Sequence, residues 1–135
     1  MKFVFKLKRT INIAASHSLK GHPKCGRMHG HNYNITVTVE GKETASNGML
    51  IDFGELKNII SKVIGRYDHM HIGRLPNGWQ GNPDHIIEVP FEFVSSENLA
   101  KHWANEIQQE LPDSLKLCQI EVQETPNNVA IWENH

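Results

Sequence analysis

Histidines are the residues of this chain whose type and spacing could do chemistry. The chain has nine in 135 residues, and histidine is both the commonest metal ligand and the side chain that titrates near neutral pH. His29 and His31 lie two residues apart in a stretch that alternates apolar and polar residues, and His17 ends an earlier stretch of the same kind. Because side chains two apart on a strand share a face, pairing of the two stretches would bring the three imidazoles together.

Three histidines that converge in this way are typical of a catalytic zinc site, because the metal keeps a fourth position for water or substrate. Cys25 lies in the loop between the two stretches, flanked by Lys24 and Arg27. A nearby metal and these positive charges would lower the pKa of its thiol, so it could act as base, nucleophile or fourth ligand. A closed structural site of Cys25 and the three histidines is the alternative that the spacing leaves open.

Two carboxylates are further candidates. Asp68 precedes His69 in a polar loop, and such a pair can supply an oriented imidazole for proton transfer, although an exposed loop is the simpler interpretation. Glu124 ends a file of alternate residues that begins at Cys118. It is either a solvent-exposed strand end or a buried acceptor for a ligand with adjacent N–H donors. We interpret Cys118 as inert packing within that apolar file.

The elements that must position these residues follow from the hydrophobic pattern. In chain order they are strands over 3–17 and 29–40, helices from Asp52 to Gly65 and from Ser95 or Ser96 to Pro112, and strands over 118–124 and 129–132. The order ββααββ predicts an α+β fold, a four-stranded antiparallel sheet with two helices on one face. Residues 66–94 give the weakest pattern, with a short strand near 86–89 as the candidate element.

Composition and charge restrict the class of protein. We expect a single domain over residues 1–135, without a membrane span, because no run approaches the ~20 apolar residues that one needs. The net charge of −1 provides no general attraction to nucleic acid or anionic lipid. Two cysteines and no secretory signal pattern indicate a reducing, cytoplasmic setting. A four-stranded sheet leaves its edges open, and such edges are usually covered, so we expect a homo-oligomer.

The segment Cys25-Gly26-Arg27-Met28-His29-Gly30-His31, with His17 upstream, resembles the 6-pyruvoyltetrahydropterin synthase family. Its C-x3-HGH spacing is similar to that of the branch formed by the 6-carboxy-5,6,7,8-tetrahydropterin synthases of the queuosine pathway. The resemblance continues through residues 48–53, 68–69, 96–100 and 121–126, while the segment from 72 to 94 is longer than usual. It implies the tunnelling fold, in which ββααββ subunits join their sheets into barrels that stack as a hexamer.

The resemblance also implies a role for each candidate residue. The ligands of a Zn²⁺ ion would be His17, His29 and His31. The residues that move protons would be Cys25, Asp68 and His69, and those that line the pterin pocket would be Glu124, which accepts N–H hydrogens of the pterin, and Glu97.

The implied enzyme is a carbon–carbon lyase that converts 7,8-dihydroneopterin triphosphate into 6-carboxy-5,6,7,8-tetrahydropterin, acetaldehyde and triphosphate. Lys20, Lys24 and Arg27 are available for the triphosphate. Two alternatives remain: a 6-pyruvoyltetrahydropterin-type synthase with the same metal and pterin sites, and a non-catalytic domain that binds zinc or pterin.

Overall fold

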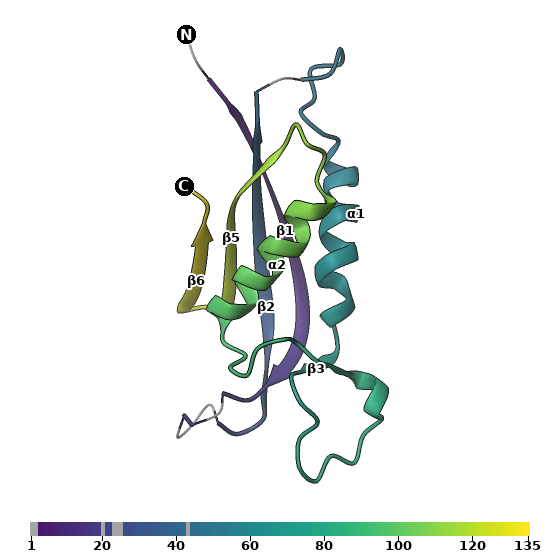
Figure 1. Ribbon diagram of the computed structural model, residues 1–135, viewed down its shortest axis with the longest axis vertical. Coiled ribbons are helices and arrows are strands. Elements are labelled where there is room, and N and C mark those ends of the chain that lie inside the picture. The colour runs from purple at the N-terminus through teal and green to yellow at the C-terminus, as the bar shows by residue number, and fades with distance from the viewer. Residues whose placement is uncertain (1–2, 20, 23–25, 43) are drawn as a thin grey trace.

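Two long strands form the centre of the structure (Figure 1). The computed structural model describes residues 3–19, 21–22, 26–42 and 44–135. Strands β1 (Phe5–His17) and β2 (His29–Gly41) pair antiparallel along their whole length, from Phe5 opposite Gly41 to His17 opposite His29. The predicted hairpin is therefore present, and its register brings the histidine-bearing ends of both strands to the same end of the sheet.

Four further strands complete a six-stranded sheet of order β4-β3-β1-β2-β5-β6. β5 (Lys116–Thr125) is antiparallel to β2, and β6 (Asn128–Glu133) is antiparallel to β5. β3 (Met70–Ile72) runs parallel to the end of β1, and β4 (Ile86–Ile87) parallel to β3. The four predicted antiparallel strands are present as β1, β2, β5 and β6, and the short strand expected near 86–89 is present as β4. The prediction of a purely antiparallel four-stranded sheet was wrong, because β3 and β4 join the sheet in parallel and β3, with three residues, is too short to show a periodic pattern.

Helix α1 (Phe53–Ile64) begins where the sequence predicted. The Asp52 side chain accepts hydrogen bonds from the backbone N–H groups of Gly54 at 2.8 Å and Glu55 at 3.2 Å. These bonds satisfy two of the donors that a helix leaves free in its first turn. A short 3₁₀ segment, Gly65–Tyr67, follows the helix directly and leads the chain toward the edge of β1.

Helix α2 (Ser96–Glu110) begins at Ser95, whose Oγ accepts from the backbone N–H of Asn98 at 3.1 Å. Both helices cover the same face of the sheet (Figure 1), as predicted. The core lies between them and the sheet and includes these buried residues: Tyr33, Ile35, Val37, Val39, Leu56, Ile60, Ile64, Leu99, Trp103, Ile107, Leu117, Ile120 and Val122. The alternate residues of β1 and β2 that are apolar therefore point toward the helices.

Cys118 does not lie in the apolar file that the sequence suggested. The register between β2 and β5 shifts between Thr38 and Val39, so that Leu117 takes the buried position and Cys118 is the extra residue of a bulge. The Cys118 side chain is only partly buried and contacts the carbonyl oxygen of Lys116. Burial nevertheless raises the pKa of its thiol, which favours the unreactive protonated form.

The sheet has open edges within the described part of the chain. Only Ala15 and Ser16 of β1 pair with β3, so most of β1 has β2 as its single neighbour. β6 pairs with β5 alone, and its Val129 and Ile131 are about half exposed, at 48% and 53%. These edges are the surfaces that the predicted homo-oligomer would cover.

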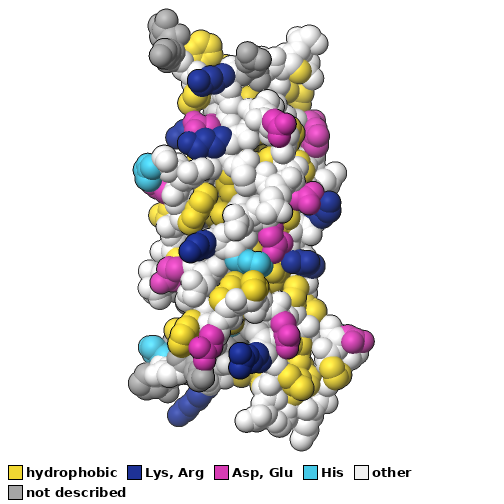
Figure 2. Space-filling view, in the orientation of Figure 1, with side chains coloured by type: hydrophobic (Ala, Val, Ile, Leu, Met, Phe, Trp, Pro, Cys, Tyr) yellow, Lys and Arg dark blue, Asp and Glu magenta, His cyan; other side chains and the backbone are white. Residues whose placement is uncertain are grey.

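None of the described helices is both long and apolar enough to cross a membrane. On the face drawn in Figure 2, basic and acidic side chains are interspersed. A nucleic-acid site would need basic residues gathered in a patch or stripe, and this face carries no such patch among the described residues.

The cap of α1 provides a test of the fold. We expect Asp52→Ala to lower the free energy of unfolding by about 1 kcal/mol, because two N–H groups of the first turn lose their acceptor. Asp113→Ala, at an exposed loop position, is the matched control and should change it by less than about 0.5 kcal/mol. Urea denaturation followed by circular dichroism measures both. Equal stability of the two variants would show that the cap contributes nothing.

Candidate metal centre

His17, His29 and His31 come together at one end of the β1–β2 hairpin, as the strand parity predicted. His17 pairs with His29 across the two strands, and His31 pairs with Ala15. The rings of His17 and His29 have centroids 4.6 Å apart, and those of His29 and His31 4.8 Å apart. The imidazoles lie on the face that the helices cover, and His17 is only 2% exposed.

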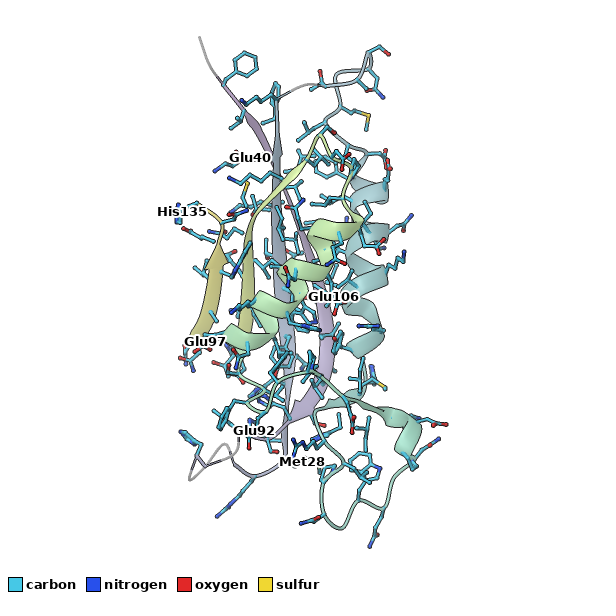
Figure 3. All side chains as sticks on the ribbon, viewed as in Figure 1. Met28, Glu40, Glu92, Glu97, Glu106 and His135 are labelled. Atoms are coloured by element: carbon cyan, nitrogen blue, oxygen red, sulfur yellow. The ribbon has the colours of Figure 1, made fainter. Side chains whose placement is uncertain are left out.

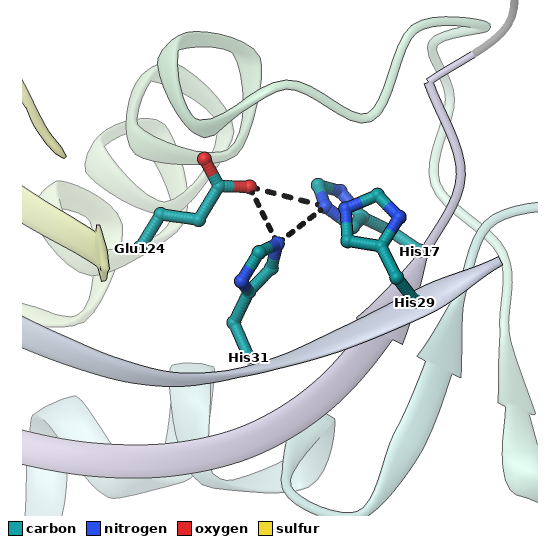
Figure 4. Close-up of side chains that lie close together, drawn as sticks. All are labelled: His17, His29, His31 and Glu124. Atoms are coloured by element: carbon teal, nitrogen blue, oxygen red, sulfur yellow. Dashed lines mark hydrogen bonds and ion pairs between the residues drawn. The ribbon is translucent and has the colours of Figure 1, made fainter. Parts of the chain in front are cut away.

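Glu124, from the end of β5, completes this group (Figure 4). Its Oε1 lies 3.1 Å from Nε2 of His17 and 3.0 Å from Nε2 of His31, and the two nitrogens are 3.2 Å apart. One ligand atom from each of the four residues lies within 4.8 Å of all the others. The four side chains could therefore hold a metal ion, and in the described part of the chain they are the one group with this geometry.

Backbone carbonyls orient two of the imidazoles. Nδ1–H of His17 donates to the carbonyl oxygen of Val94 at 2.7 Å, and Nδ1–H of His29 donates to that of Arg27 at 2.6 Å. A carbonyl cannot donate, so these bonds place the proton on Nδ1 and leave Nε2 as the free nitrogen of the neutral ring. Metal-binding histidines are commonly fixed in this way by a second hydrogen bond.

This arrangement suits a positive charge at its centre. A neutral His17 with its proton on Nδ1 directs the lone pair of Nε2 at an oxygen of the Glu124 carboxylate, and these lone pairs repel. Nε2 of His31 can donate to the same oxygen or to Nε2 of His17 only in the tautomer that carries its proton there. Protonation would relieve the repulsion, but burial lowers the pKa values of His17 and His31, against the opposing effect of the Glu124 charge. A divalent cation is the other solution, and three imidazoles with a carboxylate are ligands that suit zinc.

Glu124 also borders a cavity of about 430 Å³ between β5, β6 and the first turn of α2. Glu97 lines the same cavity, and Figure 3 shows it at the N-terminal end of α2. Ser96 lines it as well, and its buried Oγ has no hydrogen-bond partner in the described chain. The two glutamates predicted to share a pocket therefore do so, and the pocket adjoins the metal group through Glu124.

Asp68 and His69 lie at the edge of β1. Asp68 Oδ1 accepts from the backbone N–H of Ala14 at 2.8 Å and pairs with Nδ1 of His69 at 3.0 Å. The hydrogen bond from Ala14 is the main cause that lowers the pKa of the Asp68 carboxyl, with His69 adding to it. His69 has a positive φ of 61° and an 82% exposed side chain. Its backbone N–H donates to the carbonyl oxygen of Ala14.

The pair does not meet the metal group. The contacts of Asp68 and His69 within the described chain are with each other and with Ala14, and none joins them to His17, His29 or His31. The sequence predicted both sets of residues but provided no means to tell that no direct contact joins them; His31 and His69 do line one cavity. Cys25, Lys20 and Lys24 fall outside the described residues.

Sequence reasoning missed two residues at this site. Val94 supplies the carbonyl oxygen that orients His17, and a backbone acceptor leaves no signal in a sequence. Tyr33 packs its ring against His31 at 5.4 Å and His17 at 6.1 Å. Burial raises the pKa of its phenol, so it is a neutral wall of the site. Its place two residues after His31 on an alternating strand could have revealed it.

Comparison with known proteins identifies relatives of this chain. A sequence profile described as 6-pyruvoyl tetrahydropterin synthase matches residues 6–135. The chain is 30% identical over 143 residues to a 6-carboxy-5,6,7,8-tetrahydropterin synthase of Haemophilus influenzae, covering 96% of this chain and 99% of that protein. It is 28% identical over 145 residues to the human 6-pyruvoyl tetrahydrobiopterin synthase, covering 95% and 90% of the two chains.

A solved structure shares the fold. The 6-pyruvoyltetrahydropterin synthase of Plasmodium vivax superposes with a TM-score of 0.81 at 19% identity, over 98% of this chain and 99% of that one. The family that the C-x3-HGH segment suggested is thereby confirmed. This chain belongs to the 6-pyruvoyl tetrahydropterin synthase family.

Proposed function

We propose that this protein is a zinc-dependent 6-carboxy-5,6,7,8-tetrahydropterin synthase of the queuosine pathway, located in the cytoplasm. Its reaction converts 7,8-dihydroneopterin triphosphate into 6-carboxy-5,6,7,8-tetrahydropterin, acetaldehyde and triphosphate. The observation that carries the proposal is the convergence of three imidazoles and one carboxylate beside a cavity with two acidic side chains. The similarity to the 6-carboxy-5,6,7,8-tetrahydropterin synthase of Haemophilus influenzae, which covers 96% of this chain, also supports the proposal.

His17, His29 and His31 would hold the Zn²⁺ ion through Nε2. Bound zinc acts as a Lewis acid that acidifies an attached hydroxyl and polarises an attached carbonyl. Two of the three histidines are oriented by backbone carbonyls, so the site requires little rearrangement to bind. Glu124 is the ligand candidate whose position is least constrained, because it reaches the group from the end of a different strand.

Glu124 and Glu97 would bind the pterin ring in the cavity that they line. A carboxylate can accept two parallel N–H bonds, and these charge-assisted bonds are stronger than neutral ones. The ring nitrogen N3–H and the neighbouring amino group of a pterin present such a pair of donors. In this proposal Glu124 turns from the histidines toward the ring when the substrate binds, which leaves the fourth position of the metal open.

Asp68 and His69 would act as an acid/base pair, together with the Cys25 thiolate. The Asp68 carboxylate is held by the Ala14 N–H and orients the His69 ring through Nδ1. Nε2 of His69 is then the atom that gives or takes a proton. The role of Cys25 rests on its place in the C-x3-HGH segment.

A homo-oligomer would bring the two halves of the site together. Asp68 and His69 lie at an open edge of the sheet, whereas the metal group lies on its helix-covered face. A neighbouring copy that pairs its own edge with β1 would carry its metal group toward this pair. We propose the hexamer of sheet-joined barrels that the family resemblance implies.

The first test identifies the products. Purified protein loaded with zinc is incubated with 7,8-dihydroneopterin triphosphate, and the products are identified by mass. We expect 6-carboxy-5,6,7,8-tetrahydropterin and acetaldehyde in equal amounts. Accumulation of 6-pyruvoyltetrahydropterin as the main product would instead assign the activity of the human relative. Bound pterin without product over hours would indicate a binding domain.

A second test separates a catalytic metal from a structural one. His31→Ala should lose both bound zinc and turnover, since it removes a ligand. Cys25→Ala should keep one zinc per chain and lose turnover by about 10²-fold or more, the usual effect of removing an acid/base group. Metal analysis and a kinetic assay measure the two quantities. If Cys25→Ala instead loses zinc and lowers the melting temperature, the closed structural site is correct.

A third test decides the role of Glu124. Glu124→Gln should raise KM by roughly tenfold or more, because a charge-assisted hydrogen bond contributes about 1.5–3 kcal/mol, and should keep its zinc. Glu121→Gln, which changes a carboxylate of the same strand outside the cavity lining, is the control and should leave KM unchanged. Loss of zinc in Glu124→Gln would make this residue a permanent metal ligand rather than a pterin acceptor.

A further inference from the structure

A second and larger cavity, of about 610 Å³, lies where the segment 73–94 approaches the ends of β1 and β2. We call it the outer pocket. Its floor is made by small residues of the two strands, among them Ala14, Ser16 and Gly30. Because these alternate with His17 and His31 along the strands, they face away from the helices. The lining also includes His69, His71, Trp79 and His85, together with Asn32, Met70 and His31, the last of which belongs to the metal group.

The outer pocket presents hydrogen-bond donors and no carboxylate. Its ionisable lining residues are all histidines, and no Asp or Glu of the described chain lines it. The indole N–H of Trp79 is buried and has no acceptor among the described residues. A buried donor without a partner is uncommon in a native protein, so a ligand with acceptor oxygens is the expected complement.

His71 and Trp79 are held in place around the pocket. The buried His71 ring makes a 2.8 Å hydrogen bond between Nδ1 and Ser16 Oγ, and its centroid lies 5.8 Å from that of the Trp79 ring. Gly81 packs against the same indole, since a Cβ at position 81 would lie 2.9 Å from Cζ2 of Trp79. Packing contacts therefore fix the positions of the His71 and Trp79 rings that line the outer pocket.

The chemistry of the lining favours an anion over a cation. A metal ion would need ligand atoms that meet at a point, and in the described chain only the His17, His29, His31 and Glu124 group has this geometry. An organic cation would need a carboxylate or an unobstructed aromatic cage. Imidazole and indole N–H groups without a competing acid are suited to phosphate oxygens.

We propose that the outer pocket binds the triphosphate group of the substrate, with Trp79 and His85 as the residues that contact it. The inference rests on the proposed function, which places His69 beside the three-carbon side chain that carries the triphosphate. Because His69 also lines the outer pocket, a triphosphate extending from that side chain enters it. Trp79 and His85 belong to the segment 73–94, to whose side chains the proposed function assigns no other role.

The experiment measures binding of inorganic tripolyphosphate to the intact protein by calorimetry, without a pterin. Trp79→Phe removes the indole N–H but keeps an aromatic ring, and should weaken the Kd by about tenfold, as for loss of one hydrogen bond to a charged group. His85→Ala should have a similar effect. His135→Ala is the control, because His135 is exposed, pairs with Glu133 and lies away from the pocket (Figure 3). It should leave the Kd unchanged.

Steady-state kinetics provide the second readout. In both variants KM for 7,8-dihydroneopterin triphosphate should rise in the same proportion with kcat unchanged, and the affinity for phosphate-free 7,8-dihydroneopterin should not change. Tripolyphosphate binding that is equal in wild type, Trp79→Phe and His85→Ala would overturn the inference, as would an equal loss of affinity for 7,8-dihydroneopterin.

The same measurements keep the two proposals apart. If the protein turns over the pterin triphosphate but neither Trp79→Phe nor His85→Ala changes its affinity for tripolyphosphate, only the proposal that the outer pocket binds the triphosphate is refuted. A protein that binds tripolyphosphate through His85 but turns over no pterin would refute the proposed function and retain the polyphosphate site.

Discussion

The placement of the unprotonated Nε2 of His17 beside a carboxylate oxygen, at the end of the β1–β2 hairpin, is the constraint on which the site depends. Nε2 of His17 and Nε2 of His31 lie 3.2 Å apart and face one carboxylate oxygen of Glu124. The hydrogen bond from His17 to Val94 leaves that nitrogen without a proton in the neutral ring. A divalent cation would turn these facing lone pairs into ligands, so the proposed metal would also stabilise this end of the fold.

The parts of this site that the sequence could predict are those that follow from strand periodicity. Alternation placed His29 and His31 on one face, and an antiparallel hairpin could only bring His17 opposite His29 or close to it. Helix caps are equally local, which is why Asp52 and Ser95 marked the helix starts. In both cases the determining contacts lie within a few residues or follow from a single pairing of two strands.

The parts that the sequence could not predict depend on register between distant segments. The bulge that turns Cys118 out of the core exists because the register of β5 shifts by one residue against β2. No residue near Cys118 in the sequence indicates this shift. β3 is too short for periodicity. Val94 orients His17 from 77 residues away through a backbone oxygen, which any residue type other than Val would also supply.

The sheet itself separates the two sets of candidate residues. Along β1, Ala14 holds Asp68 through its backbone at the edge, whereas His17 points toward the helices three residues later. No hydrogen bond or ion pair joins the two sets within the described chain, although His31 and His69 both line the outer pocket. In the proposed oligomer, sets from neighbouring copies would meet at one substrate. The open edges of β1 and β6 would then be part of the chemistry, because a second copy that covers them in the proposed oligomer would also complete the site.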